Sequence, residues 1–132
     1  MTTKKAKVAI NGFGRIGRLF FRQAWEKDDL DIVAINDLGS VENLAYLLDF
    51  DTVYGRFGEK VSVKRNKLVV GDKEIAFSQI REPDMLPWGK LGIDIVVEAS
   101  GLGHLPVSES GHSWKGALKK HIRNGFVVCA AP

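Results

Sequence analysis

The chain of 132 residues is the size of one domain, long enough to bury a hydrophobic core and too short for two full ones. Its 45% hydrophobic and 27% charged residues match an average globular domain and exclude disordered, collagen-like and fibrous proteins. The net charge of +3 is spread along the chain, which argues against a nucleic-acid partner. No apolar run reaches the roughly 18 residues of a membrane span, and one cysteine excludes a disulfide framework or a cysteine-built metal site. We therefore expect a cytoplasmic protein.

The first fifty residues predict alternating strands and helices. Short apolar runs bounded by polar or turn residues predict buried strands over 7–11 and 31–36. Apolar residues at helical spacing predict helices over 15–27 and 41–50, the second with Ser40 as its N-cap. Strand, helix, strand and helix in this order indicate a βαβ unit, in which the strands are parallel and the crossover is right-handed.

The rest of the chain is less regular. Short segments rich in β-branched residues and separated by turn residues predict antiparallel hairpin strands over 60–64, 67–70 and 74–77. Residues 81–89 contain two prolines and predict a loop or a single helical turn. A further buried strand is expected over 93–98, a basic amphipathic helix over 114–124 and a last strand over 126–130.

A glycine triplet, Gly12-Phe-Gly-Arg-Ile-Gly17, follows the first strand directly and opens the first helix. In a dinucleotide-binding turn, the first glycine allows the tight turn and the last lets the helix lie close to the strand. The middle one, Gly14, leaves the backbone open to a pyrophosphate. The amides of Arg15 and Ile16 would then face the phosphates, with the positive end of the helix dipole behind them. The predicted cofactor-binding turn comprises Asn11, Gly12, Phe13, Gly14, Arg15, Ile16 and Gly17.

An acidic residue about 20 positions after the triplet completes the dinucleotide-binding pattern, and Asp37 stands there, at the end of the second strand. A carboxylate at this position accepts hydrogen bonds from ribose hydroxyls and repels a 2′-phosphate, so NAD is favoured over NADP. The glycines alone could form a plain tight turn, and Asp37 alone could be a solvated strand end. Their order favours a doubly wound, Rossmann-like α/β domain with a mainly parallel sheet and a small antiparallel hairpin excursion.

Three further residues are candidates for the cofactor site. Ser100 and Gly101 end a parallel strand on the side where such sheets bind ligands. Arg81 follows a strand-like run and could contact the adenine end or be an ordinary exposed arginine. The three histidines lack the spacing of a metal site or a catalytic triad, and Cys129 fits a buried hydrophobic position. No catalytic and no metal-binding residue is assigned.

Five sequence segments, in family order, resemble glyceraldehyde-3-phosphate dehydrogenase: KVAINGFGRIGR at 7–18, AINDL at 34–38, DTVYGRF at 51–57, LPWG at 86–89 and DIVVEASG at 94–101. The resemblance implies an N-terminal NAD-binding domain over 1–132. It also implies the following contacts: pyrophosphate at the amides of Arg15 and Ile16, adenosine ribose at Asp37, adenine near Arg81, and the middle of the cofactor near Ser100 and Gly101.

The chain departs from the family after Gly101, where residues 102–132 form an atypical segment. Ala130 stands where the resemblance implies a cofactor-binding hydroxyl. In the family, a cysteine in a second domain attacks the aldehyde with the help of a histidine. Hydride then passes to NAD and phosphate cleaves the resulting thioester. This second domain is absent here, so we expect weak NAD binding and no aldehyde oxidation by this chain alone.

The resemblance also implies full-length homologous subunits as partners, because the family forms homotetramers. Three other interpretations remain open from the sequence. The chain could be a non-catalytic NAD-binding or sensing module, or an RNA-interacting protein that uses its basic surface. It could also be a truncated gene product without a selected function.

Overall fold

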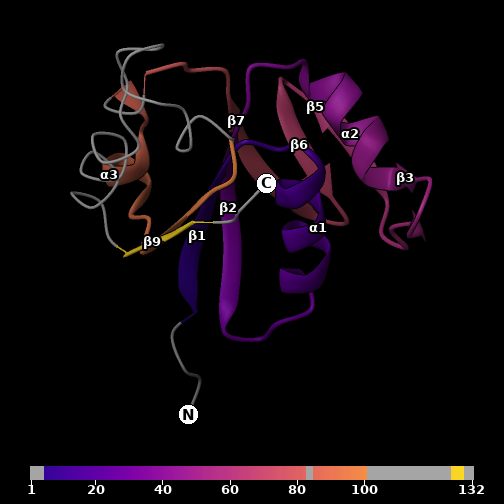
Figure 1. Ribbon diagram of the computed structural model, residues 1–132, viewed down its shortest axis with the longest axis horizontal. Helices are drawn as coiled ribbons and strands as arrows, with labels where there is room; N and C mark the ends of the chain where they lie inside the picture. The colour runs from indigo at the N-terminus through magenta and orange to yellow at the C-terminus, as the bar shows by residue number, and fades with distance from the viewer. Residues whose placement is uncertain (1–4, 83–84, 101–125, 130–132) are drawn as a thin grey trace.

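The computed structural model describes residues 5–82, 85–100 and 126–129, which form one twisted sheet with helices on both of its faces (Figure 1). The helices are α1 (Arg15–Ala24), α2 (Val41–Asp49) and α3 (Trp88–Leu91). Figure 1 shows α1 and α2 on one face and α3 on the other. The strands of the sheet are β1 (Ala6–Asn11), β2 (Leu30–Asn36), β5 (Val61–Lys64), β6 (Lys67–Val70), β7 (Lys73–Ser78), β8 (Ile95–Glu98) and β9 (Phe126–Cys129).

The strand order is β5-β6-β7-β2-β1-β8-β9, and the five strands from β7 to β9 are parallel. The chain winds outward from β1 in both directions, which is the doubly wound arrangement expected from the sequence. Strands β5 and β6 add the predicted antiparallel excursion. Their turn has positive φ at Arg65 and Asn66 (53° and 61°), a conformation that matches the twist of a two-residue hairpin.

The core lies on both faces of the sheet, because neighbouring residues of β1 and β2 point to opposite faces and both are buried. Val8 and Ile10 belong to the cluster beneath α1 and α2. Ala9 and Ala34 belong to the cluster around Trp88 of α3, whose side chain is fully buried. The larger first cluster also contains Phe13, Phe21, Ile32, Ile35, Val41, Leu44, Leu48, Leu68, Val70, Ile75 and Val97.

Several element boundaries differ from the sequence expectations. Helix α1 ends at Ala24 rather than at residue 27, and β8 begins at Ile95 rather than at residue 93. The predicted cap of α2 is confirmed, since Ser40 Oγ accepts a hydrogen bond from the Asn43 amide at 3.2 Å. Strand β7 pairs in parallel with β2 as well as antiparallel with β6, so it joins the main sheet and is not only a hairpin strand. The predicted helix over 114–124 lies outside the described residues.

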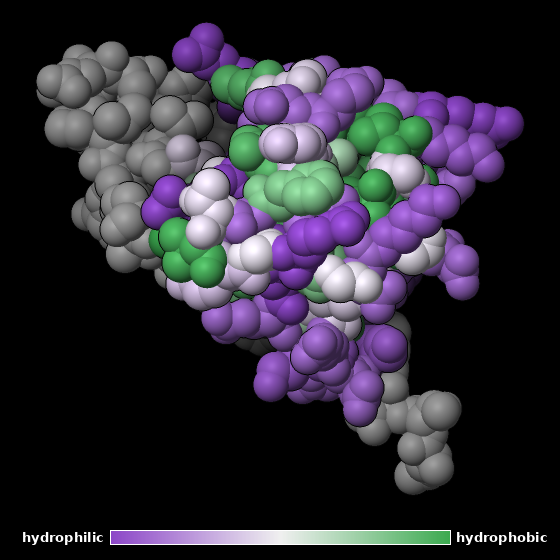
Figure 2. Space-filling view, turned by 90° about the vertical axis from the view of Figure 1, so that its right-hand side faces the viewer, coloured by the Kyte–Doolittle hydropathy of each residue, from purple (hydrophilic) through white to green (hydrophobic). Residues whose placement is uncertain are grey.

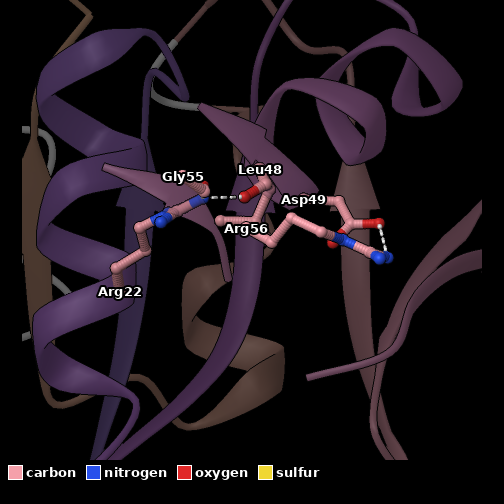
Figure 3. Close-up of polar contacts among 5 residues, drawn as sticks. All are labelled: Arg22, Leu48, Asp49, Gly55 and Arg56. Atoms are coloured by element: carbon pink, nitrogen blue, oxygen red, sulfur yellow. Dashed lines mark hydrogen bonds and ion pairs between the residues drawn. The ribbon is translucent and has the colours of Figure 1, made fainter. Parts of the chain in front are cut away.

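A small hairpin, β3 (Phe50–Asp51) with β4 (Gly55–Arg56), was not expected from the sequence. Figure 3 shows how it is attached to the domain. The guanidinium of Arg22, from α1, donates hydrogen bonds to the carbonyl oxygens of Leu48 and Gly55, each at 2.7 Å. Arg56 forms an ion pair with Asp49 at 3.6 Å. In the described part of the chain, no helix is long and apolar enough to cross a membrane.

Phe21 should be a major source of stability, because its fully buried ring contacts Phe13, Trp25 and Phe57 at centroid distances of 5.4–5.8 Å. Phe21→Ala is expected to lower the free energy of unfolding by about 3–5 kcal/mol. Phe50→Ala is the matched control, since Phe50 is 44% exposed and loss of its ring should cost about 1 kcal/mol or less. Urea unfolding followed by circular dichroism measures both losses, and equal losses would contradict this description of the core.

Candidate functional site

The glycine turn after β1 has no room for side chains at two of its three glycines. Gly12 has a φ of +95°, and a Cβ atom there would collide with the backbone of Ala99 and Ser100. A Cβ atom at Gly17 would collide with the carbonyl oxygen of Gly12. At Gly14, by contrast, a Cβ atom would meet nothing within 4 Å. The protein's own packing therefore requires the first and last glycines, whereas the middle glycine faces open space.

Helix α1 begins beside this space without a side-chain cap. Gly14 is its N-cap residue, and the first turn contains no acidic side chain. Amides of a first helical turn have no acceptor within the helix, and the helix dipole adds positive potential there. Arg15, which is exposed, and Ile16, which is partly buried, are the first two residues of α1 and directly follow Gly14. This arrangement suits an anion such as a phosphate group.

The Asp37 carboxylate lies against the same turn. Its Oδ2 accepts a hydrogen bond from the Phe13 amide at 2.7 Å, and its Oδ1 accepts one from the Gly39 amide at 2.8 Å. The Phe13 side chain is fully buried and meets the Phe21 ring edge-on, with centroids 5.6 Å apart. Phe13 therefore supports the turn through its backbone, while its ring anchors the turn in the core.

Arg18, a residue of α1 that contacts the turn, was not among the predicted site residues. Its guanidinium donates a hydrogen bond to the carbonyl oxygen of Phe13 at 3.0 Å. Burial lowers the pKa of Arg18 by disfavouring the charged form, and the negative charge of Asp51 opposes this effect. The signal for its role is its position one turn after Gly14, because helical side chains lean back toward the helix N-terminus.

Four parallel strands end in polar residues that stand side by side at the carboxyl edge of the sheet. We call them the polar row: Ser78 of β7, Asn36 of β2, Asn11 of β1 and Glu98 of β8, paired in register. Hydrogen bonds connect them along the row, from Ser78 Oγ to Asn36 Oδ1 (2.7 Å), from Asn36 Nδ2 to Asn11 Oδ1 (2.9 Å) and from Asn11 Nδ2 to Glu98 Oε2 (2.9 Å).

Of the polar row, only Asn11 was among the predicted site residues, and its side chain is bonded on both sides within the protein. The sequence signal for the other three was available. Each is a polar residue that closes an otherwise largely apolar parallel strand, where the edge of a doubly wound sheet binds ligands.

The remaining predicted residues lie around this edge. Ser100 lies two residues after the end of β8, and its hydroxyl and amide both donate to Glu98 Oε1. Arg81 is exposed, three residues beyond the end of β7. Gly101 and Ala130 lie outside the described residues. A separate hollow lined in part by Trp25, Asp31 and Lys73 lies at the opposite, amino edge of the sheet, away from the glycine turn.

The sequence matches a known domain family over the residues that form this edge of the sheet. The NAD-binding domain of glyceraldehyde 3-phosphate dehydrogenase matches residues 6–105, which include the glycine turn, Asp37 and the polar row. The chain belongs to this family. NAD is the cofactor of the family's domain, and the open space at Gly14, the uncapped helix start and the adjacent carboxylate fit a dinucleotide.

Several curated proteins are similar in sequence to this chain over most of its length. The chain is 53% identical over 126 residues to the glyceraldehyde-3-phosphate dehydrogenase of Geobacillus stearothermophilus and 48% identical over 126 residues to that of Haemophilus influenzae. Each comparison covers 96% of this chain and 36% or 37% of the relative. Glyceraldehyde-3-phosphate dehydrogenase A of Escherichia coli is 45% identical over 113 residues, which are 86% of this chain and 34% of that protein. The chain therefore spans about a third of the length of these relatives.

Gly14→Ala and Gly17→Ala should separate ligand binding from folding. Gly14→Ala has room within the protein, so the free energy of unfolding should fall by no more than about 1 kcal/mol, while NAD affinity falls at least about tenfold. Gly17→Ala collides with the backbone and should prevent folding or lower stability by several kcal/mol, roughly as overpacking does. Calorimetric titration with NAD and urea unfolding measure the two effects. Full NAD affinity in folded Gly14→Ala would contradict this placement of the cofactor.

Proposed function

We propose that the chain binds NAD at the carboxyl edge of its sheet, with the pyrophosphate on the amides of Arg15 and Ile16 and the adenosine ribose on Asp37. The observation that carries this proposal is the position of the Asp37 carboxylate, whose Oδ2 lies 2.7 Å from the Phe13 amide in the glycine turn. The carboxylate and the open helix start are thereby held next to each other. A ribose and its attached phosphates need such a pair of neighbouring sites.

Asp37 also gives the proposed site its preference for NAD over NADP. The carboxylate can accept hydrogen bonds from the ribose hydroxyls, because each carboxylate oxygen has two lone pairs. A 2′-phosphate would bring negative charge next to this carboxylate and lose the hydrogen bond from the 2′-hydroxyl. The remaining proposed contacts are the backbone of the turn, which begins at Asn11, at the phosphates, Arg81 near the adenine, and Ser100 and Gly101 near the middle of the cofactor.

For the whole enzyme, we propose oxidation of glyceraldehyde 3-phosphate with NAD as the hydride acceptor, the reaction that the names of the relatives denote. The chain supplies the cofactor-binding part of that reaction. The match to the NAD-binding domain, together with coverage of about a third of the relatives' length, supports this division between a cofactor-binding part and the rest of the enzyme.

Assembly with homologous subunits in the cytoplasm is part of the same proposal. Exposed aromatic residues on α2 and the β3–β4 hairpin support it: Tyr46 and Phe50 have ring centroids 5.0 Å apart, and Tyr54 is also exposed. Figure 2 views the side of the molecule on which Figure 1 shows α2 and β3, and apolar groups lie there among polar ones. Aromatic residues within a polar surrounding are common in protein interfaces.

Titration of the wild-type chain and of Asp37→Asn with NAD and NADP tests the cofactor assignment. The wild type should prefer NAD, and Asp37→Asn should narrow that preference by about tenfold or more, because the repelling charge is removed while one side-chain oxygen remains. Asp49→Asn is the matched control, since Asp49 pairs with Arg56 away from the turn and should leave the preference unchanged. Equal wild-type affinity for NAD and NADP would contradict the role given to Asp37.

A further inference from the structure

In the polar row, each hydrogen bond has a defined donor and a defined acceptor. The backbone of Ile80 determines this assignment at one end of the row. The Ile80 amide donates to Asn36 Oδ1 at 2.8 Å, and Asn36 Nδ2 donates to the Ile80 carbonyl oxygen at 2.8 Å. A backbone N–H can only donate and a backbone carbonyl can only accept, so these two bonds determine which end of the Asn36 amide is oxygen. The hydroxyl of Ser78 donates to the same oxygen.

This orientation is passed along the row to Glu98. Because Asn36 Nδ2 donates to Asn11 Oδ1, the other end of the Asn11 amide is its NH₂ group, which donates to Glu98 Oε2 at 2.9 Å. The second carboxylate oxygen, Oε1, accepts from the Ser100 amide at 3.1 Å and from the Ser100 hydroxyl. Both oxygens of Glu98 therefore accept hydrogen bonds, Oε2 from the Asn11 amide group and Oε1 from the Ser100 backbone amide.

Glu98 is only 5% exposed, and a buried carboxylate is unfavourable unless hydrogen bonds compensate for its lost hydration. What the carboxylate adds is a bridge between β1, through Asn11, and the backbone of Ser100. The Ser100 backbone is also the surface against which the glycine turn packs at Gly12.

We propose that Glu98 is a positioning residue for the dinucleotide. Its carboxylate, together with the fixed amides of Asn11 and Asn36, holds the ends of β7, β2, β1 and β8 in the relative positions that the cofactor requires. This inference rests on the proposed function, because it concerns the same edge of the sheet. It assigns to Glu98 and Asn36 a role through neighbouring groups and not through contact with NAD.

The direction of the bonds allows a test by exchanging donor and acceptor. In Glu98→Gln, the new NH₂ group faces either the NH₂ group of Asn11 or the backbone amide of Ser100. In both orientations two hydrogen-bond donors face each other and one hydrogen bond is lost. Adding Asn11→Asp removes the conflict, since the introduced glutamine amide can then donate to the new carboxylate while its oxygen still accepts from Ser100. The new carboxylate also still accepts from Asn36. The double variant keeps the number of carboxylates and restores the hydrogen bonds between positions 36 and 11, between positions 11 and 98, and from Ser100 to position 98.

Calorimetric titration should show that Glu98→Gln weakens NAD binding about tenfold or more, as loss of a supporting hydrogen-bond partner does in other sites. Asn11→Asp alone should also weaken it, because two carboxylates then face each other. The NAD affinity of the double variant should lie within about threefold of the wild-type affinity, because the effects of two substitutions in direct contact are not additive. Glu42→Gln makes the same substitution on an exposed residue of α2 and should have no effect.

AMP distinguishes positioning from general destabilisation. AMP covers only the Asp37 side of the edge, so Glu98→Gln should weaken AMP binding less than about threefold, whereas a loosened fold would weaken AMP and NAD alike. If Glu98→Gln does not fold, the double variant must still fold and bind NAD. The proposal is overturned by full NAD affinity in Glu98→Gln, by equal losses for AMP and NAD, or by a double variant no better than the poorer single one. A wild type that binds neither nucleotide would overturn the proposed function itself.

Discussion

The close approach of the ends of β1 and β8 is the constraint on which the rest of the site depends. At Gly12 the backbone turns against the backbone of Ser100 with no space for a side chain, and at Gly17 the helix packs equally closely onto the turn. The shape of the binding edge is thus set by main-chain contacts, which vary little with side-chain motion. Only at Gly14 does the turn leave a free surface. The fold therefore requires a glycine at positions 12 and 17 but not at position 14, where the proposed cofactor site is the reason for a glycine.

The parallel strands carry apolar residues along most of their length and polar residues at their carboxyl ends. The bodies of β1 and β2 are apolar on both faces and pack into two core clusters, as expected for parallel strands covered by helices. At the carboxyl edge, polar side chains are buried and satisfied by one another and by backbone groups. A buried polar group without a partner costs about 1–3 kcal/mol, so this edge is stable only as a complete set. A single unsuitable residue in the polar row therefore affects several strands at once.

Much of the fold follows from local signals in the sequence. The periodicity of residues 7–50, the glycine triplet and the position of Asp37 suffice to predict β1, α1, β2, α2 and the edge at which they meet. The β3–β4 hairpin could not be predicted, because its two-residue strands are held by Arg22 from a different part of the chain. The parallel pairing of β7 with β2 was missed for a similar reason, since the pattern of one strand does not reveal its partners on both sides. Glu98 and Asn36 become informative only when the register places them next to Asn11.

The two hydrogen bonds that Asp37 accepts from Phe13 and Gly39 restrict how the proposed site could evolve to bind NADP, which carries an additional 2′-phosphate. Removing the carboxylate would relieve repulsion of the extra phosphate and, in the same step, leave the Phe13 amide without its acceptor. An ancestor changing its cofactor would thus need a compensating group near the turn, either a new polar side chain or the incoming phosphate itself. In the proposed site, one carboxylate both sets the cofactor preference and accepts the hydrogen bonds that hold the turn, so a substitution of Asp37 changes both properties together.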